Sequence, residues 1–439
     1  MRRGLRHIYL FGLVLLGLLT SAPVFAGGFI RDAEIEKLLL DYATPIFLAA
    51  GLNPDNVGIG VIDDRRLNAF VAGGQNIFFH TGLILEADTP NVVIGVIAHE
   101  VGHIKGGHLA RMPGAIAKAR TPAVIATILG IGALVAGQGD AGLALITGGQ
   151  QIAERSFLTY SRAQEAAADQ VALQLLEATE QSPEGIIELM GDLADQEILS
   201  EANQDPYARS HPLSRDRVNA YEAGRERSAF REVKDSPQLQ KRHDLAKAKI
   251  YGFLDHPSTT LRRYAEQNDL PARYAKSIAY HKRGLTDESL TLIDTLIAEQ
   301  PNNPYFYELK GQVLFEAGRI TESSLPYAKS VALDPNEPLL LIGLAATKVA
   351  LEKKTTAREA IKLLKQALRF DPDNTTAYFQ LARAYSQIGE IARAELATAE
   401  RFFLYGQTDK AKKHARRAAQ QLKKGSPEWI RARDIAADI

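Results

Sequence analysis

The clearest candidates for chemistry are His99 and His103, which are separated by three residues, and Glu100, which follows the first histidine. If this segment is helical, four residues make about 400° of rotation, so both imidazoles lie on one face, about 6 Å apart along the axis, and can reach one ion. Glu100 then projects sideways, where a general base can take a proton from a water at the metal without being a ligand itself. The spacing predicts a zinc site that serves hydrolysis.

The neighbouring residues predict a buried helix that presents these polar groups to a cavity. Asp88, Thr89 and Pro90 combine a capping side chain with a proline at the first helical position, which is typical of a helix start. Gly106 and Gly107 indicate where this helix weakens or bends. The residues that flank the motif are apolar, namely Ile94, Val96, Ile97, Val101 and Ile104. Burial there costs several kcal/mol unless the polar groups are paired or bind a metal, which favours a metal site over a chance match.

A catalytic zinc ion needs a third protein ligand, and the sequence offers two candidates. His108 follows a glycine, as the third ligand does in HExxHxxGxxH metallopeptidases, but that motif needs a histidine one position later, where Leu109 stands. His108 is therefore expected at a helix end or on the surface. The other candidate is Glu165 of a later helix, with Asp169 one turn further on the same face. A carboxylate at position 169 would orient a ligand histidine by accepting its N–H.

The order of the motifs resembles a known family. HEVGH at residues 99–103 is followed about 60 residues later by SRAQEAAAD at residues 161–169 and then by His211-Pro212. This order is similar to that of the HtpX-like gluzincin zinc metallopeptidases, which combine HExxH with an ExxxD helix. A signal peptide ahead and repeats behind make the likeness greatest to the periplasmic members that assist outer-membrane β-barrel assembly. The segment 68–84 resembles the edge-strand region beside the active cleft of that family.

The resemblance implies a role for each matching residue. One zinc ion would be held by His99, His103 and Glu165, with Glu100 as the catalytic base and Asp169 in the outer shell.

The segment 210–217 also resembles a part of the family in which a histidine and an arginine come near the metal, and we assign these roles to His211 and Arg215. Three hypotheses for the role of His211 stay open. It would donate a hydrogen bond to the oxyanion that develops on the substrate, bind zinc as a fourth ligand that silences the enzyme, or be a structural loop histidine.

Composition and charge exclude several other classes of protein. The 439 residues are enough for at least two folded units. The absence of cysteine excludes thiol catalysis, thiolate ligands and disulfides. Because 52 basic residues balance 52 acidic residues, a nucleic-acid partner is not expected.

The N-terminus predicts export. Three arginines precede a 12-residue apolar run at residues 8–19, and Ala26 stands before a suitable cleavage site. We expect a signal peptide at residues 1–26 and a periplasmic mature chain, because 12 apolar residues are too few for a membrane anchor. The second apolar segment, residues 122–149, is interpreted as a buried or lid-like helix, with a hairpin that touches the membrane as the alternative.

The remaining pattern predicts a chain that is α+β and mostly α. The alternation from Asn56 to His80 predicts a small β-sheet within a helical, zincin-type catalytic domain at residues 27–235. A helical connector at 236–269 leads to an all-α tetratricopeptide solenoid at 270–439. The repeat is indicated by Pro301 and Pro335, which are 34 residues apart, and by glycines at a fixed offset, namely Gly284, Gly318 and Gly389. The middle unit carries about three extra residues near 352–356, which should break the register of its first helix.

These features predict a zinc-dependent endopeptidase that hydrolyses misfolded or stalled outer-membrane proteins, with the repeats recruiting clients or the β-barrel assembly machinery. The alternative is a non-proteolytic chaperone or adaptor with a structural metal, but such a site has no need of Glu100. Residues 401–439 hold 10 basic and 4 acidic residues, which leaves an acidic partner protein or anionic lipid open.

Overall fold

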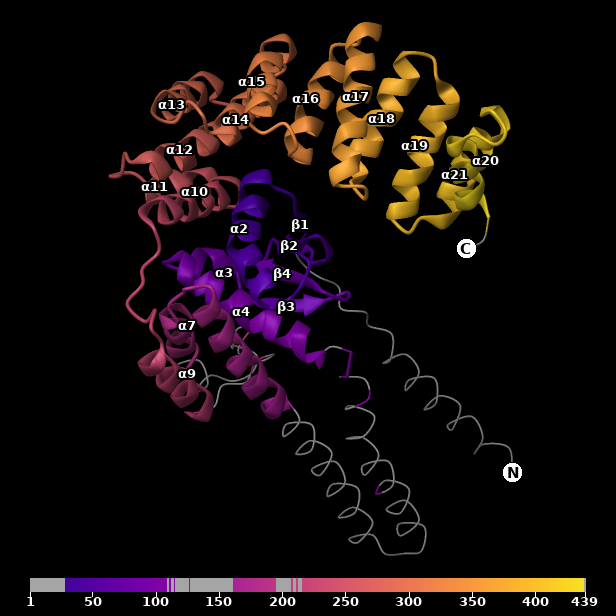
Figure 1. Ribbon diagram of the computed structural model, residues 1–439. Coiled ribbons are helices and arrows are strands. Elements are labelled where there is room, and N and C mark those ends of the chain that lie inside the picture. The colour runs from indigo at the N-terminus through magenta and orange to yellow at the C-terminus, as the bar shows by residue number, and fades with distance from the viewer. Residues whose placement is uncertain are drawn as a thin grey trace, which may run out of the picture.

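The computed structural model describes residues 28–108, 110–111, 114, 126, 161–194, 207, 211 and 215–437. The expected signal peptide lies outside this part of the chain, and so does the apolar segment 122–149 apart from residue 126. Among the described helices, none combines the length and the apolar content that crossing a bilayer requires. Figure 1 shows a sheet with helices in the N-terminal half and an arc of paired helices that leads to the C-terminus.

Three strands of a four-stranded sheet lie where the alternating pattern predicts them, and a fourth, at residues 29–30, lies outside that pattern. The strands are β1 (Phe29–Ile30), β2 (Ile59–Ile62), β3 (Ala69–Ala72) and β4 (Asn76–His80), in the order β1-β2-β4-β3. β2 and β4 are parallel, whereas β1 pairs antiparallel with β2, and β3 pairs antiparallel with β4. Gly73 and Gly74 make the turn between β3 and β4 with φ angles of 58° and 99°, which other residues rarely adopt. Because β3 comes last in the strand order, it forms one edge of the described sheet.

The helices that accompany the sheet position the candidate site. They are α2 (Ala33–Ala49), α3 (Thr81–Glu86), α4 (Pro90–Gly106), α7 (Glu184–Ala194) and α9 (Arg215–Arg227), together with the 3-10 turn η1 (Pro54–Asn56). Residues 161–178 are also helical. α4 carries the HEVGH motif and packs against α2, α7 and β3.

The two ends of α4 agree with the sequence signals, with one difference at the start. Thr89 is the N-cap residue, but its side chain makes no capping hydrogen bond. Instead, the Asp235 carboxylate accepts the backbone N–H of Asn91 at 2.8 Å. The helix ends at Gly107, whose φ of 61° is left-handed. All residues from position 90 to position 102 are buried, so the motif belongs to the core.

Gly102 allows α4 to lie directly on the helix that carries Glu165. A Cβ atom at position 102 would lie 2.7 Å from the carbonyl oxygen of Ala168 and 2.9 Å from its Cα. Since both are backbone atoms, the two helices would have to separate. We expect Gly102→Ala to lower the free energy of unfolding by about 1–3 kcal/mol, measured by urea denaturation of the metal-free protein.

A glycine in α7 provides the matched control for this substitution. Nothing lies within 4 Å of a Cβ atom built on Gly191, so Gly191→Ala should be neutral or slightly stabilising. An equal loss of stability in both variants would contradict the packing explanation.

The C-terminal half is a solenoid of paired helices, as the repeat signal predicts. Two helices, α10 (Pro237–Leu254) and α11 (Pro257–Arg263), precede the repeats. The helices of the repeats are α12 (Leu270–Lys282), α13 (Thr286–Glu299), α14 (Pro304–Glu316), α15 (Ile320–Leu333), α16 (Pro338–Ala350), α17 (Lys354–Phe370), α18 (Thr375–Gln387), α19 (Ile391–Leu404), α20 (Thr408–Gln421) and α21 (Pro427–Ala436). Gly284, Gly318 and Gly389 take left-handed φ angles of 74°, 77° and 84° at the turns inside the helix pairs.

The irregular middle repeat differs from the expectation in one detail. Its first helix, α16, has 13 residues, the same length as α12, α14 and α18. The extra residues lengthen the second helix instead, because α17 has 17 residues whereas α13, α15 and α19 have 14. Glu352 occupies the turn position of the glycines with a φ of 55°.

Helix α10 connects the two halves, and its apolar residues contribute to the cores of both. Its Lys249 is 4% exposed and lies 2.7 Å from Asp32 Oδ2, 3.4 Å from Glu34 Oε2 and 3.8 Å from Glu308 Oε2. The Tyr274 hydroxyl donates to Glu34 Oε2 at 2.8 Å. A buried charge cluster therefore joins α2, the connector and the first repeats.

Candidate metal centre

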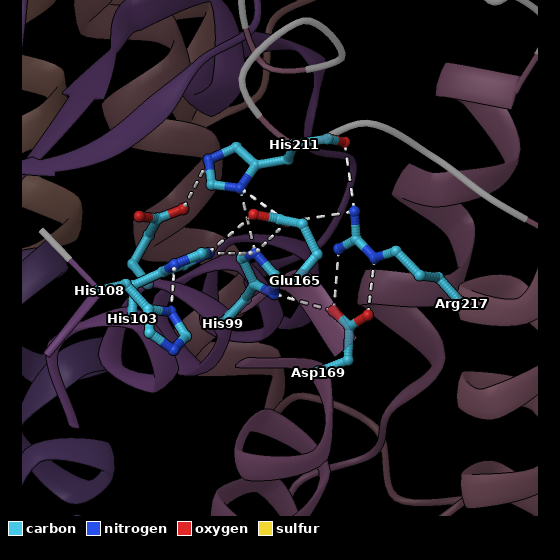
Figure 2. Close-up of polar contacts among 8 residues, drawn as sticks. His99, His103, His108, Glu165, Asp169, His211 and Arg217 are labelled. Atoms are coloured by element: carbon cyan, nitrogen blue, oxygen red, sulfur yellow. Dashed lines mark hydrogen bonds and ion pairs between the residues drawn. The ribbon is translucent and has the colours of Figure 1, made fainter. Parts of the chain in front are cut away.

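Four side chains from three segments converge beside α4. Nε2 of His103 lies 3.1 Å from Nε2 of His99, as the one-turn spacing predicts. Glu165 places Oε2 3.3 Å from His99 Nε2 and Oε1 3.4 Å from His103 Nε2. Nδ1 of His211 lies 3.2 Å from His99 Nε2 and 3.0 Å from Glu165 Oε2, as Figure 2 shows. The structure thus brings residues separated by more than 100 positions into one group.

The spacing and the chemistry of these atoms fit a metal ion. Nitrogen and oxygen ligands lie about 2.0–2.2 Å from zinc, which puts the ligand atoms of a tetrahedral site about 3.3–3.6 Å apart. The separations given above, from 3.0 to 3.4 Å, approach these values. Within the described residues, this is the single group of histidine and carboxylate side chains arranged to hold an ion.

Asp169 and Arg217 fix the orientation of His99. Oδ1 of Asp169 lies 3.0 Å from Nδ1 of His99, which leaves Nε2 facing the ligand group. Arg217 donates to both oxygens of Asp169, from Nε at 2.6 Å and from Nη2 at 2.9 Å. Its Nη1 donates to the carbonyl of His211 at 3.2 Å and lies 3.2 Å from Glu165 Oε2. This arginine therefore links three segments of the site (Figure 2).

Glu100 lies beside the ligand group without belonging to it. Its side chain is 1% exposed, and its Oε1 lies 3.4 Å from Nε2 of His211. Burial raises the pKa of Glu100, although His211 and His99 act in the opposite direction. A raised pKa suits a carboxylate that takes up and returns a proton. Burial also lowers the pKa of His103 to about 2, so this imidazole is neutral, as a metal ligand must be.

His108 lies at the end of α4, one of the two places that the sequence suggests, but it is buried and not on the surface. It is 6% exposed, and its Nδ1 lies 2.9 Å from Nδ1 of His103. The left-handed Gly107 turns the chain after α4, and the His108 ring then contacts the Nδ1 side of the His103 ring. It is placed to orient His103 and is not a member of the ligand group.

The arginine near the ligand group is Arg217 and not Arg215. Arg215 is the exposed first residue of α9, whereas Arg217 is 4% exposed. Residues two apart on a helix point about 200° away from each other, so the two arginines face opposite sides. Arg217 and Tyr221 are the buried residues of α9 and are spaced by four, which is the signal that could have distinguished them.

Tyr207 lines the site, although no sequence signal indicated it. It is 1% exposed, and its ring centroid lies 4.5 Å from that of His211 and 6.5 Å from that of His99. Its backbone N–H donates to the carbonyl of Leu67, just before β3, at 3.3 Å. Tyr207 thereby connects the edge strand with the ligand group.

Comparison with known proteins assigns both halves of the chain. Residues 30–224 match Peptidase family M48, and residues 274–338 and 353–400 match two tetratricopeptide repeat families. The chain is therefore a metalloprotease that carries a peptidase family M48 domain followed by tetratricopeptide repeats.

The similarity to individual proteins extends through both halves. The Beta-barrel assembly-enhancing proteases of Yersinia pestis and Escherichia coli (strain K12) are each 24% identical to it, over 380 and 381 residues, and each alignment covers 84% of this chain and 76% of the relative. The Metalloprotease LoiP of Escherichia coli (strain K12) is 29% identical over 187 residues, which cover 43% of this chain and 69% of that protein.

Proposed function

We propose that this protein is a zinc-dependent endopeptidase of the periplasm that cleaves misfolded or stalled outer-membrane proteins. The observation that carries the proposal is the ligand group of His99, His103 and Glu165 with Glu100 directly beside it. The similarity to beta-barrel assembly-enhancing proteases over 84% of the chain supports this substrate class and compartment. The expected signal peptide supports export.

The side chains of the site have complementary roles in this proposal. Zinc held by the two α4 histidines and Glu165 would polarise the scissile carbonyl and lower the pKa of water. Glu100 accepts the proton of the attacking water and then delivers it to the leaving amine. Asp169 and Arg217 keep the His99 ring in the orientation that presents Nε2.

The outer edge of β3 is proposed to bind the substrate backbone. The His80 N–H donates to the Asn68 carbonyl at 3.0 Å, so the pairs 68/80, 70/78 and 72/76 carry the hydrogen bonds of the β3–β4 ladder. The N–H and C=O groups of Ala69 and Val71 then point to the other edge, where no described strand pairs; Ala69 is buried, so the partly exposed Val71 is the residue placed to pair first. Main-chain pairing there favours extended segments of unfolded proteins over particular sequences. The repeats would recruit such clients, or the assembly machinery, to the peptidase.

Zinc content and cleavage, measured on the same purified mature protein, test the proposal. We expect one zinc ion per chain and cleavage of an unfolded outer-membrane protein that stops on chelation and returns with added zinc. Glu165→Gln should weaken zinc binding by more than about 100-fold, because it removes a charged ligand from a buried site. Glu177→Gln is the matched control, since Glu177 lies on the same helix but is exposed and binds Ser228. Zinc that stays bound to the Glu165→Gln variant would contradict the ligand assignment.

His211 is proposed to be the fourth ligand that closes the site. Its Nδ1 lies among the ligand atoms, which favours this role over that of an oxyanion donor. We expect His211→Ala to retain zinc and to raise the rate of casein cleavage about tenfold, which corresponds to a closed state favoured by about 1.4 kcal/mol. Loss of cleavage with zinc retained would assign His211 to the oxyanion instead. His281→Ala, in the distant α12, should leave the rate unchanged.

A further inference from the structure

A groove between the last repeats has the properties of a second binding site. Its volume is about 560 Å³, and it is lined by α18, α19 and one residue of α20. Phe379 and Ile391, which line it, are 39% and 47% exposed although they are apolar. A groove of this size accommodates a few side chains of a partner.

Two arginines flank Phe379 in this groove. The guanidinium of Arg401 lies 4.6 Å from the Phe379 ring centroid, and that of Arg383 lies 5.8 Å from it. Neither arginine forms an ion pair within the described part of the chain. Arg383 donates to Gln380 at 3.4 Å, and Arg401 contacts the Tyr405 side chain, with its guanidinium 5.4 Å from the ring centroid. The Nε atom of Arg401 is buried without a hydrogen-bond partner. Such a donor gains free energy when an acceptor enters the groove.

Neighbouring arginines outside the groove, unlike Arg383 and Arg401, form ion pairs with glutamates. Arg393 binds Glu390 at 2.6 Å, and Arg431 binds Glu400 at 2.7 Å. The one carboxylate among the groove residues, Glu395, is already engaged by His414 at 2.5 Å. The groove therefore presents positive charge that its own acidic residue does not neutralise.

We propose that this groove binds an extended acidic segment of a partner protein, whose carboxylate pairs with Arg383 and Arg401. An adjoining apolar side chain of the segment packs on Phe379 and Ile391.

Arginine suits this role because its planar fork of donors matches a carboxylate and stacks on an aromatic ring. The excess of basic residues at 401–439, 10 against 4 acidic, steers an acidic partner to this end of the solenoid. A recessed apolar floor fits a peptide better than a flat lipid surface. The site needs neither metal nor cleavage, so its test is independent of the proposed peptidase.

The experiment measures binding of two fluorescent nonapeptides by anisotropy. One alternates glutamate with phenylalanine, and the other has glutamine in place of each glutamate. The mature full-length protein carries Glu100→Gln so that neither peptide is cut. We expect the acidic peptide to bind at least about tenfold more tightly than its neutral counterpart, and more weakly in 300 mM than in 50 mM salt.

Substitution of the arginines then locates the site. Arg383→Gln combined with Arg401→Gln should weaken binding of the acidic peptide at least about tenfold, to the level of the neutral peptide. Arg393→Gln is the matched control on α19 and should bind like the parent. Thermal unfolding of each variant checks that the repeats remain folded.

Three results would overturn the proposal. They are equal or absent binding of the two peptides, unchanged binding by the double variant, and a double variant that loses affinity only for phosphatidylglycerol vesicles. The last of these would assign the arginines to a lipid surface.

Discussion

Replacing Glu100 by glutamine is expected to lower the rate of peptide cleavage by about 10²–10⁴-fold while one zinc ion stays bound per chain. Glutamine has nearly the same shape but cannot accept the proton of the attacking water. Glu100 lies beside the ligand group and not in it, so the metal site itself should remain intact. The measurement is the initial rate of cleavage of an unfolded outer-membrane protein, with zinc determined on the same sample.

A second glutamate on the same part of the fold separates chemistry from general damage. Glu86→Gln, at the exposed end of α3, should cleave at the parental rate. If Glu100→Gln were as active as this control, the mechanism would be excluded. A parent protein that binds zinc but shows no cleavage would instead favour the alternative of a chaperone with a structural metal.

Local spacing explains why the main parts of this site could be predicted from the sequence. His99 and His103 share a face of α4, and Glu165 and Asp169 share a face of a second helix, because each pair is four residues apart. The repeats were predictable for the same reason, since each turn requires a left-handed residue at a fixed offset. Even Glu352 adopts that conformation, so the turn is set by the repeat and not by glycine alone.

Other features depend on contacts between distant segments, and these could not be read from spacing. Choosing Arg217 over Arg215 requires knowing which side of α9 faces Asp169. Tyr207 is a single aromatic residue in a polar segment, and only the fold brings it to His211. His108 reaches His103 because Gly107 makes a left-handed turn after α4. Alignment of the sequence with the HExxHxxGxxH motif does not reveal this turn.

The charge cluster between the two halves is a further long-range feature, and its disruption is expected to have a large effect on stability. Replacing Lys249 by methionine is expected to lower the free energy of unfolding by about 3–5 kcal/mol at pH 8. The substitution leaves the buried Glu34 and the partly buried Asp32 and Glu308 close together without their common cation. Urea denaturation at pH 8 and at pH 5 measures the effect.

The loss should be smaller at pH 5, and the sign follows from the pKa values of the acids. Burial raises the pKa of Glu308 from 4.5 to about 7 and also raises that of Glu34, although Lys249 opposes both shifts. An acid whose pKa is raised by folding costs stability as the pH increases from its unfolded to its folded value. Without the lysine this cost increases. The difference in the free energy of unfolding between the parent and the variant should therefore grow between pH 5 and pH 8.

Two further variants distinguish charge from packing. Lys241 lies on the same helix but is 43% exposed and 3.5 Å from the equally exposed Glu299, so Lys241→Met should cost less than about 1 kcal/mol. Adding Glu308→Gln to Lys249→Met should restore part of the stability at pH 8 and flatten the pH dependence, because one negative charge is removed. A deficit that is the same at both pH values would instead mean that the lysine stabilises the junction through the packing of its aliphatic chain.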